Sequence, residues 1–317
     1  MSETALPGLK RDVALAPYTT LKIGGPADYF IEVRTEDQLV RAADWSGRRG
    51  ISRLVIGSGS NLLVSNRGFS GLVIRNSITG IRQSGQRLMV KGGTLLQDLV
   101  NFANRAGLQG LEKMTGIPGT LAGAIYGNAG AYGQTISDRL TQVRVFDGRK
   151  VQSLSRSQGL FSYRESIFKE RKELAILEAE FVLAPAEPKV LQAASRKIRA
   201  LREAKYPTKL KCPGSFFKNL RREELPPEIL ANIPKEKIIH GKIPAGYLLE
   251  AVGANGKSRG SVRIASYHGN LFFNSGGGTA EDFLALAKEY RRRVKEKFGI
   301  LLEPEVQLIG FGLEGTW

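Results

Sequence analysis

The chain has 317 residues and carries 47 Lys and Arg against 30 Asp and Glu, a formal net charge of +17. This length predicts two or three domains. One cysteine and two histidines exclude an internal disulfide and an ordinary closed zinc site. No signal-peptide pattern opens the sequence, and its least polar long stretch is too rich in glycine for a membrane helix. We therefore expect a cytoplasmic protein without membrane association and without bound metal.

The positive charge is unevenly distributed, and most of the excess lies in residues 186–300. Such a balance favours an anionic partner, or it serves only solubility. Zinc-finger, RNA-recognition and homeodomain signatures are absent, and aromatic residues do not interleave with the basic ones as they do in a stacking platform for nucleic acid. A small polyanionic ligand therefore fits at least as well as a nucleic acid.

The first predicted elements are strands on either side of a short helix. Thr35 opens a capping-box pattern with Gln38, and helical spacing continues to the region of Gly50. Residues 18–33 predict a turn into a strand, and RLVIGSGSNLLVS at 53–65 predicts a strand, a Gly/Ser turn and a second strand. A Rossmann loop leads from a strand into a helix, so this order excludes a Rossmann domain.

Strands and helices also alternate irregularly further along the chain, which predicts an α+β protein. A basic helix from Pro188 to Lys205 would connect to a second domain, where Thr279 caps a helix that ends at Gly299. LLEPEVQLIGF at 301–311 predicts a final strand. The other predictions are strands at 71–76, 87–93, 142–147 and 174–183 and a helix from Leu95 to Ala106 that Gly107 closes.

Two glycine-rich stretches could hold a ligand. GSGSN at 57–61 offers consecutive backbone N–H groups that can bind phosphate oxygens, although a flexible hairpin turn explains it equally well. GIPGTLAGAIYGNAGAYG at 116–133 has too many glycines for a helix interior, which favours a backbone that lies against something flat and large. A glycine-rich packing face of a helix is the alternative.

Three further stretches carry polar groups suited to chemistry. SYRESIFK contains Arg164, whose planar fork matches a carboxylate or a phosphate. LEPEV places Glu303 and Glu305 two residues apart, so on a strand both would point to one face. In KCPGSFFKNL, Ser215 stands between a glycine and two phenylalanines.

Two further stretches are TTLKIGGPADYF near the start and AGYLLEAVG before the final helix. All these stretches together, in this order along the chain, resemble the UDP-N-acetylenolpyruvoylglucosamine reductase family. The resemblance implies an FAD-binding domain of the vanillyl-alcohol-oxidase type and a smaller α+β substrate-binding domain. It also implies non-covalent FAD, NADPH as co-substrate, and reduction of an enolpyruvyl sugar nucleotide in peptidoglycan precursor synthesis. The implied domains are residues 1–187 for FAD, in two lobes that divide near 75–80, residues 188–300 for the substrate, and a terminal strand segment at 301–317.

The resemblance also implies roles for individual residues. Ser215 would donate a proton, while Arg164 and Glu305 would stabilise the charge that develops on the substrate. The two Phe would exclude water, and Lys218 is a neighbouring cation. The implied FAD contacts are Gly57, Ser58, Gly59, Ser60 and Asn61 at the pyrophosphate and Pro118, Gly119, Gly123 and Ala124 along the flavin; the implied substrate contacts are Lys205, Lys218, Asn219 and His268.

The chain departs from one branch of the family, which carries an extra segment with a substrate-covering tyrosine. Here the strand near Pro185 runs directly into the basic helix, so we expect the shorter branch, and Tyr206 does not take that role. Cys212 has no histidine nearby in the sequence and is expected to be incidental. Another flavoenzyme of the same fold and a basic nucleic-acid-binding protein are the alternative functions, and we expect a monomer that binds no nucleic acid.

Overall fold

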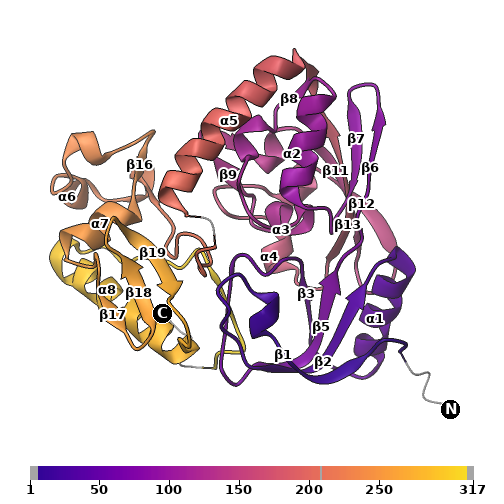
Figure 1. Cartoon of the computed structure of the whole chain (residues 1–317), viewed down its shortest axis with the longest axis horizontal. Coiled ribbons are helices and arrows are strands. Elements are labelled where there is room, and N and C mark those ends of the chain that lie inside the picture. Colours follow the sequence, from indigo (N-terminus) through magenta and orange to yellow (C-terminus); the bar gives the residue numbers. More distant parts are fainter. Residues whose placement is uncertain (1–5, 208, 313–317) are drawn as a thin grey trace. The chain divides into compact units, whose positions relative to one another are not determined.

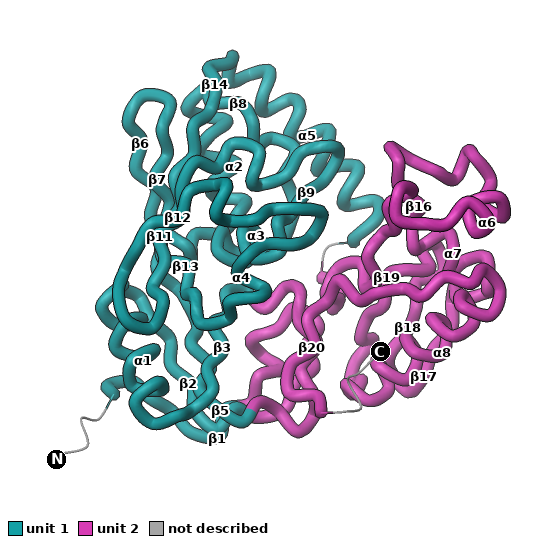
Figure 2. Tube along the Cα trace, turned by 180° about the vertical axis from the view of Figure 1, so that it is seen from behind, with its two compact units in different colours: residues 1–13, 27–58, 70–207 teal, residues 14–26, 59–69, 208–317 magenta. Residues whose placement is uncertain are grey.

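The computed structural model describes residues 6–207 and 209–312. The chain divides into two compact units (Figure 2). Unit 1 contains residues 1–13, 27–58 and 70–207, and unit 2 contains residues 14–26, 59–69 and 208–317. These units do not coincide with the expected domains, because the helix that begins at Pro188 belongs to unit 1 and two early segments belong to unit 2. The functional domain boundaries remain predictions, and residues 313–317 of the last one lie outside the described residues.

The first sheet of unit 1 has four strands in the order β1-β2-β5-β3 (Figure 1). The strands are β1 (Lys10–Ala14), β2 (Pro26–Val33), β3 (Arg53–Ile56) and β5 (Phe69–Asn76). Helix α1 (Glu36–Arg48) follows β2 and begins with the predicted capping box of Thr35 and Gln38. Leu39, Ala42 and Ala43 of α1 are buried in one cluster with Leu72 and Ile74 of β5. The helix therefore covers the sheet through its apolar face.

The second sheet of unit 1 is antiparallel, with the order β12-β11-β13-β7-β6. Apolar side chains of β7 and β13 form one core with α2 (Leu96–Arg105) and α3 (Leu121–Tyr126). The long helix α5 (Pro188–Lys205) lies against α2 (Figure 1). The five strands are β6 (Ile81–Ser84), β7 (Arg87–Lys91), β11 (Leu140–Phe146), β12 (Val151–Ser155) and β13 (Ala175–Val182).

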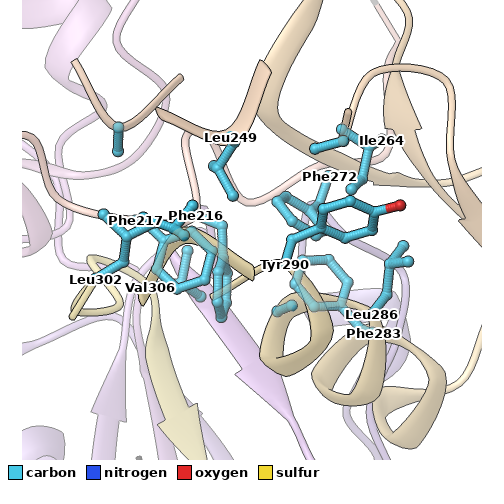
Figure 3. Packing of buried hydrophobic residues seen from close by; sticks show 14 of the residues in the cluster. Phe216, Phe217, Leu249, Ile264, Phe272, Phe283, Leu286, Tyr290, Leu302 and Val306 are labelled. Carbon is cyan, nitrogen blue, oxygen red and sulfur yellow. The ribbon is translucent and has the colours of Figure 1, made fainter. Parts of the chain in front are cut away.

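Unit 2 is built around a three-stranded sheet and two helices. The sheet has the order β17-β18-β19, and its strands are β17 (Ser258–Arg259), β18 (Val262–Ala265) and β19 (His268–Asn274). Helices α7 (Ala245–Ala251) and α8 (Ala280–Phe298) supply much of the core, and β4 (Leu62–Val64) pairs in parallel with β20 (Gln307–Ile309). Figure 3 shows this core, with Phe216 and Phe217 in the same cluster as Phe272, Phe283 and Tyr290.

Short elements complete both units. In unit 1 they are β8 (Leu108–Gln109), η2 (Glu112–Met114), β9 (Gly130–Ala131), β10 (Gln134–Thr135), η3 (Ile136–Asp138), η4 (Ser157–Gly159), α4 (Ile167–Glu170) and β14 (Ala184–Pro185). In unit 2 they are η1 (Ala16–Tyr18), β15 (Leu220–Arg221), η5 (Arg222–Glu224), α6 (Pro227–Leu230), η6 (Lys235–Lys237) and β16 (Lys242–Ile243). None of the helices in the described parts of the chain is long and apolar enough to cross a membrane.

Most of the predicted long elements are confirmed, but the final strand is shorter than expected. The structure begins β20 at Gln307, so the prediction that Glu303 and Glu305 share a face of a strand is wrong. Pro304 has no N–H to donate to a ladder, and the chain bends after it. In the glycine-rich stretch, residues 121–126 form α3, which includes the exposed Gly123.

Candidate active site

The turn of residues 57–61 follows β3 and returns into β4, as predicted from the sequence. A Cβ atom on Gly57 would lie 2.1 Å from Oγ1 of Thr120, so only glycine fits beside this residue within unit 1. A Cβ atom on Gly59 would lie 2.1 Å from the carbonyl oxygen of Tyr18, and Gly59 has a φ of +62°. Both glycines are therefore required by close approach of the protein itself.

The turn presents backbone N–H groups that the protein does not use. Across the described residues, no protein oxygen accepts a hydrogen bond from the backbone N–H of Gly57, Ser58, Gly59 or Asn61. A row of such groups in a glycine-rich turn suits the oxygens of a diphosphate. The residues present therefore fit the pyrophosphate of FAD.

The predicted flavin-side residues lie around the start of α3. Thr120 caps this helix through its side chain, which accepts a hydrogen bond from the N–H of Gly123 at 3.4 Å. Gly119 has a φ of +123°, and its carbonyl oxygen accepts from the N–H of Leu96 at 3.0 Å. Pro118 and Gly123 are exposed, whereas Ala124 is buried. Since Gly57 packs against Thr120, unit 1 brings parts of both glycine-rich stretches together.

Arg164 occupies the tip of a tight turn in unit 1. Ser162 and Glu165 close this turn through two backbone hydrogen bonds of 3.1 and 3.2 Å. Arg164 has a φ of +61°, a left-handed conformation that costs a non-glycine residue about 1 to 2 kcal/mol. Its Nη2 donates to the carbonyl oxygen of Gly130 at 2.9 Å. The turn and this bond together orient the guanidinium.

Ser215 lies in unit 2 opposite β19, where it forms an isolated antiparallel bridge with Leu271. Gly214 before it has a φ of +88° and open space around its Cα, so conformation rather than crowding requires the glycine. After it, the N–H of Phe216 donates to the carbonyl oxygen of Asn270 at 3.0 Å. The backbone on both sides of the serine is thus defined.

The two phenylalanines after the serine belong to the hydrophobic core of unit 2. Phe216 and Phe217 are both fully buried in the core of unit 2, where Phe216 contacts Phe272 and Phe283 at ring-centroid distances of 5.6 and 5.1 Å (Figure 3). This burial does not test the expectation that they exclude water around the hydroxyl. They anchor the segment that carries Ser215 to the core.

Glu305 lies beside the serine segment in the same unit. Its N–H donates to the carbonyl oxygen of Phe216 at 2.7 Å. Its own carbonyl oxygen accepts from Nδ2 of Asn61 at 3.1 Å, and the N–H of Gln307 donates to the carbonyl oxygen of Asn61 at 3.0 Å. Unit 2 therefore joins the end of the GSGSN turn, the Glu305 segment and the residue after Ser215.

The predicted substrate contacts of unit 2 make local contacts of their own. Nζ of Lys218 lies 3.3 Å from the carboxylate of Glu303, so this ammonium already has an anionic partner. Oδ1 of Asn219 accepts from the N–H of Ala245 at 3.1 Å and so fixes the start of α7. The predictions that Lys218 and Asn219 contact the substrate are not tested by these contacts.

His268 and Lys205 differ in burial. Nδ1 of His268 lies 3.8 Å from the carboxylate of Glu250, and a Cβ atom on Gly246 would lie 2.9 Å from Cε1 of the imidazole. The histidine is thus packed tightly against α7. Lys205, at the end of α5 in unit 1, is exposed, with Nζ 5.4 Å from the ring centre of Tyr206.

Two residues that lie close to predicted site residues were not identified from the sequence. Asn270 is 1% exposed, and it bonds both the N–H and the carbonyl oxygen of Phe217 at 2.8 Å. Arg202 is a partly buried cation of α5, in a helix whose many basic residues gave no reason to select it. Burial also raises the pKa of the Cys212 thiol, which disfavours the thiolate and agrees with an incidental role.

Comparisons with known proteins agree with this arrangement. The family model described as FAD binding domain matches residues 27–150, and the model described as UDP-N-acetylenolpyruvoylglucosamine reductase, C-terminal domain, matches residues 206–309. The UDP-N-acetylenolpyruvoylglucosamine reductase of Solibacter usitatus is 45% identical and covers 93% of this chain and 95% of its own length. The corresponding enzyme of Rubrobacter xylanophilus is 38% identical, with 96% of each chain covered.

A solved structure shows the same fold. The crystal structure of UDP-N-acetylenolpyruvylglucosamine reductase from Thermus caldophilus matches with a TM-score of 0.76 and 32% identity, over 95% of this chain and 98% of that one. The fold and the glycine-rich turn define an FAD-binding oxidoreductase of the vanillyl-alcohol-oxidase type. Since the identity to the relatives extends over nearly the whole chain, it belongs to the UDP-N-acetylenolpyruvoylglucosamine reductase family.

Proposed function

We propose that the chain reduces the enolpyruvyl group of UDP-N-acetylglucosamine enolpyruvate to give UDP-N-acetylmuramate, with NADPH as the source of the hydride. The observation that carries this proposal is the 45% identity over 93% of the chain to a relative named for this reductase. The reaction belongs to peptidoglycan precursor synthesis, and through it to the growth that underlies cell shape and division. We expect it to take place in the cytoplasm, catalysed by a monomer.

The two glycine-rich stretches would hold FAD. The N–H groups of residues 57–61 suit its pyrophosphate, and Pro118, Gly119, Gly123 and Ala124 suit a contact along its flavin. When bound, FAD would supply the redox chemistry by which a hydride from NADPH reaches the substrate. The protein must then bind and orient the enolpyruvyl group and control its charge and its proton.

Hydride addition to the terminal carbon of the enolpyruvyl group leaves negative charge on the adjacent carbon, and this charge spreads into the carboxylate. Arg164 is suited to this carboxylate because its planar guanidinium can donate two parallel hydrogen bonds. The strained turn that carries Arg164 gives it a fixed position before substrate binds. Glu305 would favour the enolic form of the acid by sharing or donating a proton.

The adjacent carbon must then receive a proton, and we assign this donation to Ser215. The backbone bonds of the following residue to Asn270 and to Glu305 hold the serine segment on two sides. A general acid contributes most when its position is fixed within hydrogen-bond reach of the reacting atom. The family resemblance implies the role of Ser215, and the described contacts of unit 2 add that the segment carrying it is held in place.

An anaerobic experiment tests both half-reactions separately. NADPH is added to the purified, flavin-loaded protein, and the loss of the oxidised-flavin absorbance is followed. UDP-N-acetylglucosamine enolpyruvate is then added, and return of that absorbance reports reduction of the substrate. If NADPH bleaches the flavin but the substrate does not restore it, the reaction belongs to another flavoenzyme of the same fold.

Ser215→Ala separates the role of the serine from that of the fold. We expect flavin reduction by NADPH to be unchanged and the return of absorbance to be slowed about 100-fold or more, the scale for a lost general acid. Ser266→Ala, at an exposed serine of the same unit, serves as the matched control. An unchanged second half-reaction in Ser215→Ala would remove the serine from the mechanism.

A further inference from the structure

Arg202 lies near the end of α5, one helical turn before Lys205, and is packed against the start of the 116–133 stretch. A Cβ atom on Gly116 would lie 3.1 Å from Cδ and 3.2 Å from Nε of Arg202. Cζ of Arg202 also lies 5.3 Å from the ring centre of Tyr206. The Arg202 side chain is therefore close to both a glycine and an aromatic ring.

This guanidinium lacks the polar partners that a partly buried arginine normally has. Its Nε is enclosed and donates no hydrogen bond. Throughout residues 6–207 and 209–312, no carboxylate or carbonyl oxygen pairs with Arg202. Arg53 and Arg291, by contrast, donate to backbone carbonyl oxygens at 3.0 and 2.7 Å. Arg53 and Arg291 thus place donors on protein oxygens, whereas the described residues offer Arg202 no such acceptor.

The charge around Arg202 is also unfavourable. Burial holds the pKa of Arg202 below its usual range, the nearby hydroxyls of Tyr206 and Tyr132 oppose this shift, and the positive charge of Arg164 adds to it. An arginine stays charged at any working pH. Two neighbouring guanidinium groups, one of them without an anionic partner, cost free energy unless an anion binds between or beside them.

We propose that Arg202 binds a phosphate group of the nucleotide ligand, while Arg164 keeps the role at the carboxylate that is proposed above. The inference rests on the proposed function, because UDP-sugar and NADPH both present a nucleotide diphosphate to this protein. A phosphate offers oxygen acceptors in the geometry that the guanidinium fork requires. The exposed Lys205, one turn later on α5, would then contribute charge at the rim of the same site.

The test is calorimetric and needs no turnover. UDP, NADP⁺ and uridine are titrated separately into the oxidised, flavin-loaded protein and into Arg202→Gln. We expect the dissociation constant for UDP, for NADP⁺ or for both to rise about 10- to 100-fold, the range for one lost hydrogen bond between charged groups. Binding of uridine, which has no phosphate, is expected to be the same in both proteins.

Arg199→Gln is the matched control, because Arg199 is an exposed arginine of the same helix. Weaker binding of UDP alone assigns the phosphate to the sugar nucleotide, weaker binding of NADP⁺ alone assigns it to the dinucleotide, and weaker binding of both assigns a shared position. Unchanged dissociation constants in Arg202→Gln would overturn the proposal. So would loss of bound flavin from this variant, because the arginine would then hold FAD.

Failure of the proposed function can be told apart from failure of this inference. If the parent protein does not reduce the enolpyruvyl substrate but still binds UDP or NADP⁺ through Arg202, the reaction is wrong and the phosphate site stands. If the parent reduces the substrate and Arg202→Gln binds both nucleotides normally, the reaction stands and the phosphate site is wrong.

Discussion

Replacing Asn270 by alanine should destabilise unit 2 and misplace the serine segment. The carboxamide accepts from the N–H of Phe217 and donates to its carbonyl oxygen, both at 2.8 Å, among side chains that are fully buried. Alanine removes the hydrogen-bond partner that Asn270 provides to each of these two buried backbone groups. Each unpaired buried group costs about 1 to 3 kcal/mol, so the expected loss is about 2 to 6 kcal/mol. This is a large part of the usual stability of a domain.

Urea unfolding followed by far-UV circular dichroism measures this loss, and the two anaerobic half-reactions measure its effect on the site. We expect Asn270→Ala to slow the return of flavin absorbance with substrate more than it slows flavin reduction by NADPH. Asn232→Ala, at an exposed asparagine of the same unit, is the control. An unfolding free energy within about 0.5 kcal/mol of the parent protein would refute the reasoning, because that is the range of an ordinary surface substitution.

Asn270→Asp sharpens the test through its pH dependence. The introduced carboxylate can still accept from the N–H of Phe217, but it can donate to the carbonyl oxygen only when it is protonated. Burial and this donation both favour the protonated acid, so the pKa of the introduced carboxyl is raised in the folded state. Its stabilising contribution is complete below the unfolded pKa and is lost as the pH rises through the folded pKa. The variant should therefore gain stability relative to the parent on acidification, and an equal or larger loss would contradict this.

Two other substitutions test the cofactor turn and the sheet of unit 1. Gly57→Ala should lower the amount of flavin bound per protein, which is measured by absorbance. The added methyl group would lie 2.1 Å from Oγ1 of Thr120, and such overpacking costs about 1 to 3 kcal/mol. Combining it with Thr120→Gly should restore part of the flavin binding, whereas a full flavin complement in Gly57→Ala alone would contradict the prediction. Glu36→Gln should lower the unfolding free energy at neutral pH by about 1.5 to 3 kcal/mol, because it weakens bonds to Lys91 at 2.6 Å and to Arg144 at 2.8 Å. Burial acts to raise the pKa of Glu36, but these two bonds hold the pKa below its usual range. The stabilising contribution of Glu36 is present above its unfolded pKa and is lost as the pH falls through its lowered folded pKa. The urea midpoints of the parent protein and Glu36→Gln should therefore converge in acid. A difference between the two midpoints that does not change with pH would contradict the assignment.

The elements that could be predicted from the sequence are those whose signals are local. The capping box at Thr35, the Thr279 cap of α8 and the strand-turn-strand order around GSGSN each depend on residues a few positions apart, and each is found in the structure. The final strand was misplaced because alternation of side chains does not show where Pro304 interrupts the ladder. Local patterns therefore predicted which elements form better than where they end.

The supports of the candidate site could not be predicted because they depend on pairs far apart in sequence. Asn270 holds a peptide group 53 residues away, and nothing in its own neighbourhood distinguishes it from a turn residue. Arg202 is one of many basic residues on α5, and only tertiary packing shows which of them is enclosed. The family resemblance identified residues that would contact ligands, whereas residues that act through the backbone required the structure.

The acidity of Ser215 poses a chemical question that the contacts of unit 2 help to answer. A serine hydroxyl is a weak acid, and Lys218, the nearest basic residue in sequence, already has a carboxylate partner at 3.3 Å. Strong stabilisation of an alkoxide by Lys218 is therefore disfavoured. The carbon that receives the proton is strongly basic after hydride addition, so a weak acid suffices if it is correctly placed. Correct placement is served by the backbone bonds that Phe216 forms with Asn270 and with Glu305. The main contribution of the serine segment is therefore the position of the hydroxyl rather than its acidity.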